Sequence, residues 1–194
     1  MYSPTVGDTP DDADRAVHGR PPNSHDEWAT LVGSLRCVPA FMYDKHMTVV
    51  AANSLARRLD RVFEPGNNLV LDAFRPRDGG PPDDADLRNK RDQAVAVLRA
   101  SLRRHPEDGV FLDIVGELAA TSAEFSSLWA STTPMKNTDT ITFQLRPGES
   151  VKLTYHRLEA SGRDGEVLVI FHPADQAATR VLDELITRHQ GAAE

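Results

Sequence analysis

The chain has 194 residues, of which 40% are hydrophobic and 26% charged, and its formal net charge is -7. This length suits one domain with a full core, and the acidic balance argues against direct binding of nucleic acid or anionic membranes. The single cysteine, Cys37, excludes an internal disulfide, and the chain shows neither a secretory signal nor an apolar run long enough to span a membrane, so we expect a cytoplasmic protein.

The first predicted features are an unstructured segment and a helix. Residues 1–23 combine Pro, Gly and Asp with almost no apolar periodicity, so we expect a disordered acidic tail that cannot bury enough surface to order itself. Apolar side chains from Trp28 to Leu35 recur at helical spacing. They predict a short helix that begins near Ser24 and is ended by Pro39.

A β-hairpin and a second short helix are predicted next. The runs 41–43 and 48–51 are strand-like, and the polar residues between them are typical of a tight turn. Asn53 precedes the segment 54–59, where its side-chain oxygen can accept hydrogen bonds from the free amides of a helix start.

Helices dominate the middle of the chain. Residues 65–84 are rich in Pro, Gly and Asp and predict a long connection, after which apolar residues at helical spacing predict a helix over 86–104. A second helix is predicted around residues 110–118. A third opens at Thr121, which has the spacing of a capping box with Glu124.

The last third changes from helical to strand periodicity. Apolar residues alternate with polar ones over 141–145 and 151–155, and the run 167–171 is apolar throughout. These runs predict a three-stranded antiparallel meander whose last strand is covered on both faces. An amphipathic segment at 178–186 predicts a terminal helix. The order of elements indicates an α+β fold.

Five segments carry a resemblance to a known family: VPAFMYDKHMTVVAAN, PGNNLV, AVAVLRASLRRHPED, IVGELAATSAEFSSLW and LVIFHPA. In order and spacing they resemble the PAS-like ligand-binding domain of MmyB-type transcription regulators over about residues 28–186. The resemblance implies one PAS-like domain over residues 24–190. We expect a five-stranded antiparallel sheet in which the hairpin pairs with the last meander strand, helices over one face, and flanking helices at both ends. It also implies a small hydrophobic ligand, such as a fatty acid or a related acyl compound.

Two departures from the family pattern limit what the resemblance implies. Family members usually carry a helix-turn-helix domain before this one, and the 23 residues before the first predicted helix are too few for it. We therefore expect no direct contact with nucleic acid. In the meander, Arg146-Pro147 stands where the family tends to have a His-Pro pair, so no role of that histidine carries over.

The predicted ligand pocket lies between the sheet and the helices, where inward-pointing side chains would line it. Arg91 falls on the apolar stripe of the helix over 86–104. There it could pair with a ligand carboxylate, or pack its aliphatic part over the core and keep its guanidinium group in water. Each of the other candidates also fits an ordinary core position. The candidates are Phe41, Tyr43, Phe74, Arg91, Leu98, Trp129, Phe143, Leu153 and Tyr155.

No enzyme motif and no metal-ligand spacing such as H-x-x-x-H is recognisable, so we assign no catalytic residue, no metal and no cofactor. Three functions stay open. The leading one is a stand-alone sensor whose ligand state is relayed to a partner regulator. An enzyme of specialised metabolism could use the same cavity, and a protein without a ligand could form a homodimer or pair with a full-length transcription regulator.

Overall fold

The computed structural model describes residues 24–76, 85–131, 133–160 and 165–190, so the predicted disordered tail, residues 1–23, lies outside the described residues. The elements follow the predicted order of helix, hairpin, helices, meander and helix. Before the meander they are α1 (Ser24–Ser34), β1 (Ala40–Tyr43), β2 (Val49–Ala52), α2 (Ser54–Leu59), the 3-10 helix η2 (Arg61–Phe63), α3 (Leu69–Ala73), α4 (Ala85–Arg104), α5 (Gly109–Thr121) and α6 (Ala123–Ala130). The meander and the last helix are β3 (Thr138–Arg146), β4 (Glu149–Glu159), β5 (Val167–Pro173) and α7 (Gln176–Gln190).

One antiparallel sheet contains all five strands, in the order β2-β1-β5-β4-β3. β1 pairs along its whole length with β5, from Ala40 opposite Ile170 to Tyr43 opposite Val167. The hairpin near the start and the meander near the end therefore share a single sheet. The predicted α+β fold and this pairing are confirmed.

Strand alternation gives the sheet two apolar faces. On β1, Phe41 and Tyr43 point to one face and Ala40 and Met42 to the other, and all four side chains are buried. α1 covers the second face at β1 and β2, where Val32 joins the same buried cluster as Ala40 and Met42. Apolar residues of β5 also pack into both clusters, as its uninterrupted apolar run predicted.

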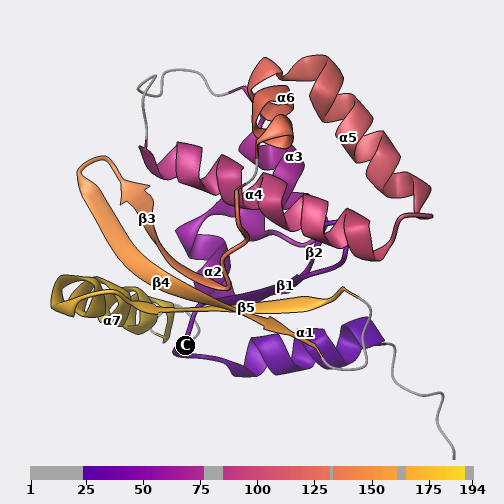
Figure 1. Cartoon of the computed structure of the whole chain (residues 1–194). Helices are drawn as coiled ribbons and strands as arrows, with labels where there is room; N and C mark the ends of the chain where they lie inside the picture. The colour runs from indigo at the N-terminus through magenta and orange to yellow at the C-terminus, as the bar shows by residue number, and fades with distance from the viewer. Residues whose placement is uncertain (1–23, 77–84, 132, 161–164, 191–194) are drawn as a thin grey trace, which may run out of the picture.

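Helices α3, α4, α5 and α6 lie over the first face of the sheet, and we call this layer the roof (Figure 1). Leu98, Phe111 and Phe125 come from three of these helices and are fully buried, so the roof contributes its own part of the core. α7 packs against β4, β5 and α2. Within the described residues, no helix is long and apolar enough to cross a membrane.

Asn53 joins the start of α2 to the chain around β1. As predicted, its side-chain oxygen caps α2 by accepting from the amide of Ala56 at 2.9 Å, and it also accepts from the amide of Ala40 at 3.2 Å. Its amide group donates to the carbonyls of Leu35 and Val38, both at 2.7 Å. Because only 5% of Asn53 is exposed, these four bonds satisfy backbone groups that water does not reach.

Two local predictions differ from the structure. The N-cap of α6 is Ser122, whose hydroxyl accepts from the amide of Phe125 at 3.1 Å, and the hydroxyl of Thr121 instead donates to the carbonyl of Glu117. The predicted capping box at Thr121 was therefore wrong by one residue. The predicted connection also contains α3, which Asn68 caps by accepting from two amides.

Candidate ligand-binding cavity

A cavity of about 170 Å³ lies between the roof and the first face of the sheet, and it is partly open to solvent. Strands β1, β3, β4 and β5 form its floor, and η2, α3 and α4 form the remaining walls. Most of the lining is apolar. Since an apolar cavity of about 150 Å³ can hold one benzene molecule, this space accommodates a group about the size of an aromatic ring.

Three phenylalanines of the floor strands pack against Phe63 of η2, and we call these four residues the phenylalanine floor. Phe41 stacks on Phe63 with ring centroids 4.3 Å apart, and Phe143 meets both Phe171 and Phe63 edge-on, at 5.4 and 5.9 Å. These offset and edge-on arrangements are the ones that aromatic quadrupoles favour. The floor is suited to the apolar part of a ligand.

Arg157 of β4 brings a positive charge into this wall. Its Nε donates to the hydroxyl oxygen of Tyr43 at 2.7 Å, and its Nη2 donates to the same oxygen. The remaining nitrogen, Nη1, is buried and has no hydrogen-bond partner among the described residues. No carboxylate of the described residues pairs with this guanidinium.

The two tyrosines near this cation are neutral. Burial raises the pKa of Tyr43, and burial together with the negative charge of Asp139 raises the pKa of Tyr155 to about 12. Both hydroxyls therefore keep their protons at neutral pH. Neither tyrosine neutralises Arg157, and both can form hydrogen bonds with a polar group in the cavity.

The other polar side chains in the wall already have neighbours. Asp60 accepts from the amide of Val62, Asp72 of α3 pairs with Arg75, and the rest belong to α4. Asn89 donates to the carboxylate of Asp139 at 3.2 Å, and Gln93 bonds to the backbone that leads into β3. The ammonium group of Lys90 lies 5.3 Å from the ring centroid of Phe143, a cation–π distance. Arg157 differs from them, because one of its donors is buried without a partner in the described part of the chain.

A model of the MmyB-like transcription regulator ligand binding domain matches residues 25–185. The chain belongs to this family. An MmyB-like ligand-binding domain is a regulatory module for a small molecule, and the match includes every element that lines the cavity. A search of the curated proteins found no match to the chain.

Four of the nine predicted ligand-binding residues come together on the cavity wall of this MmyB-like domain. They are Phe41 and Tyr43 from β1, Phe143 from β3 and Tyr155 from β4. All four point to the first face of the sheet, as strand alternation requires.

Arg91 and Phe74 lie outside the cavity, in the contacts between roof helices. Nε of Arg91 donates to the carbonyl of Ala73 at 2.8 Å, and its Nη1 pairs with the carboxylate of Glu124 at 2.5 Å. Its guanidinium also lies over the ring of Phe74. In the MmyB-like domain this arginine joins α3, α4 and α6 and is not directed at the cavity.

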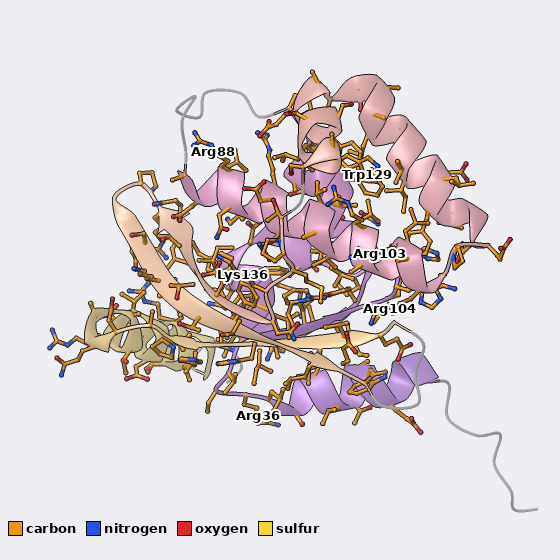
Figure 2. All side chains as sticks on the ribbon, viewed as in Figure 1. Arg36, Arg88, Arg103, Arg104, Trp129 and Lys136 are labelled. Atoms are coloured by element: carbon orange, nitrogen blue, oxygen red, sulfur yellow. The ribbon has the colours of Figure 1, made fainter. Side chains whose placement is uncertain are left out.

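Trp129, Leu98 and Leu153 do not line the cavity either. Trp129 stacks on Phe125 at 5.5 Å, and Figure 2 shows it among the helices of the roof. Leu98 and Leu153 are fully buried in the core shared by roof and sheet.

Several lining residues were not predicted from the sequence, above all Phe63, Phe171 and Arg157. The latter two could have been found by extending the strand alternation, since Phe171 follows Val169 by two residues and Arg157 follows Tyr155 by two. Phe63 lies in the short helix η2, where no periodic pattern marks the inward face.

Proposed function

We propose that this MmyB-like domain is a PAS-like sensor for a small hydrophobic ligand with an acidic head group, such as a fatty acid or a related acyl compound. The observation that carries the proposal is the unpaired cation of Arg157 within a mainly apolar cavity. A partly buried charge without a counter-charge is costly, and an anionic ligand would offset that cost. The apolar body of the ligand would rest on the phenylalanine floor.

The head group is expected to bind Nη1 of Arg157. The hydroxyl of Tyr43 accepts hydrogen bonds from the other two guanidinium nitrogens, so the Arg157 side chain is already ordered. Binding of an anion therefore costs little further conformational entropy of this side chain. Charge-assisted hydrogen bonds from arginine to carboxylate are short and strong. The hydroxyl of Tyr155, which keeps its proton, is a second donor available to the same anion.

The size of the cavity favours a short or medium-length ligand. A volume of about 170 Å³ takes a ring-sized group, so a long acyl chain would have to extend through the open side or displace part of the roof. Displacement of α4 is one way in which ligand binding could alter the outside of the molecule, because α4 lines the cavity and also bonds to α6 through Arg91 and Arg99.

For regulation, the ligand must bind two arrangements of the domain with different affinity. We propose that the liganded arrangement is read by a second copy of this domain or by a partner regulator in the cytoplasm. Light scattering of the purified chain with and without ligand tests the homodimer.

Calorimetric titration with octanoic acid and with 1-octanol tests the proposal directly. The two probes share their chain and differ in the charge of the head group. Arg157→Gln removes the charge and should weaken octanoate binding by about 10- to 100-fold, since a hydrogen bond to a charged group contributes about 1.5–3 kcal/mol. Binding of octanol should change little.

Arg103→Gln is the matched control, because Arg103 is an exposed arginine of the roof (Figure 2) and does not line the cavity. Equal loss of octanoate binding in the two variants would contradict the role of Arg157. If neither probe binds, and native mass spectra show no co-purifying small molecule, the sensor proposal itself fails. That result would favour the alternative of a protein that binds another protein and no small ligand.

A further inference from the structure

A pair of histidines lies on the face of the sheet opposite the cavity. His156 of β4 and His172 of β5 each follow a cavity-lining residue by one position, so both side chains point away from the cavity. Their Nε2 atoms are 3.0 Å apart, and the rings are nearly parallel, with centroids 5.1 Å apart. Sixteen residues separate the two in sequence, and only the pairing of β4 with β5 brings them together.

The second nitrogen of His172 fixes which of its ring nitrogens carries the proton. Its Nδ1 lies 2.9 Å from the carbonyl oxygen of Pro173, which can only accept, so in the neutral ring Nδ1 is protonated and Nε2 presents a lone pair. Histidines that bind metals characteristically donate their other ring N–H to a carbonyl or carboxylate in this way. This bond is independent of the contact between the two rings.

We infer that His156 and His172 form a binding site for a divalent transition-metal ion of the zinc class, which both Nε2 atoms coordinate. Two imidazole nitrogens at about 2.0–2.1 Å from one ion, with an angle between about 90° and 109°, are about 2.8–3.4 Å apart. The observed 3.0 Å falls in this range.

Binding requires no net loss of a proton from the neutral pair. The proton that His156 shares with His172 moves from Nε2 to Nδ1 of His156 through solvent, and the freed lone pair binds the ion. Imidazole nitrogen suits Zn²⁺, Ni²⁺ and Cu²⁺ and does not suit Mg²⁺ or Ca²⁺. Among the described residues no third His, Cys, Asp or Glu joins the pair, so water fills the remaining positions of the ion.

Calorimetric titration of the untagged full chain with ZnCl₂, and separately with MgCl₂, tests the site. We expect one Zn²⁺ per chain and no response to Mg²⁺. His156→Ala and His172→Ala should each weaken Zn²⁺ binding by roughly 10-fold or more, because loss of even an outer-shell partner typically costs that much. Lys152→Ala, an exposed position on the same face of β4, is the control and should leave the affinity unchanged.

Nuclear magnetic resonance of the unmodified chain tests the site without a variant. Zn²⁺ should shift the ring signals of His156 and His172 before those of His46 and His105. Unchanged affinity in the double alanine variant, or first shifts at other histidines, would overturn the assignment. Failure of Zn²⁺ binding would not count against the proposed ligand cavity, since the histidine pair lies on the other face of the sheet.

Discussion

Arg157 and Tyr43 should be strongly coupled when unfolding is measured without ligand. Tyr43→Phe removes the hydroxyl that accepts from two guanidinium nitrogens, and unsatisfied donors of this kind cost about 1–3 kcal/mol. Arg157→Met leaves the hydroxyl of Tyr43, which is 4% exposed, without that partner, at a similar cost that loss of the uncompensated cation partly offsets. Removing both groups is expected to be nearly neutral or stabilising, because neither polar group is then left behind.

Urea denaturation of the four proteins measures this coupling, provided that all share one slope with denaturant. The two single losses should together exceed the loss in the double variant by about 2 kcal/mol or more. The exposed pair Arg104–Glu159 supplies a control cycle with Arg104→Met and Glu159→Gln, where we expect at most about 1 kcal/mol. Single losses at Arg157 and Tyr43 that add within about 0.5 kcal/mol would refute the reasoning.

Two further predictions concern stability. Asn53→Ala leaves two amides and two carbonyls without their partner and should lower the free energy of unfolding by about 3–5 kcal/mol. Asp175→Ala removes an exposed helix cap and should lower it by about 1 kcal/mol. Similar urea midpoints for the two variants would contradict this prediction. Hydrogen bonds from Lys45 and His46 hold the pKa of Asp108 at about 2, below its usual 3.8, so its contribution is present above about pH 4 and is lost as the pH falls toward 2. Acid titration of Asp108→Asn, followed by circular dichroism, should show a smaller loss over that range; an identical acid transition would speak against this contribution.

Most of the architecture could be predicted because its longer elements have local sequence signals. Alternation over 141–145 and 151–155, and the uniformly apolar run 167–171, are patterns of strands whatever surrounds them. The position of Asn53 likewise marks a helix start by its own chemistry. α3 escaped prediction because five residues are too few to show a period, and its cap, Asn68, lies in a segment rich in turn formers.

The inward face of α4 could not be read from periodicity. α4 lies between the sheet and other roof helices, so it has two covered sides. Lys90, Ala94 and Val97 line the cavity, while Arg91 and Arg99 reach α6. A helix covered on two sides carries an apolar pattern that does not say which side faces the sheet. Arg91 was therefore predicted at the cavity although it belongs to the helix contacts.

The cation at the cavity depends on strand register, which no local pattern contains. Tyr43 lies opposite Val167 of β5, and Arg157 lies opposite Val169 of the same strand, so the two polar residues are diagonal neighbours across β5. They are 114 residues apart in sequence. The arginine side chain crosses β5 to reach the hydroxyl of Tyr43. Shifting β4 by one residue against β5 would turn Arg157 to the outer face, so the charge of the cavity follows from the register of the sheet.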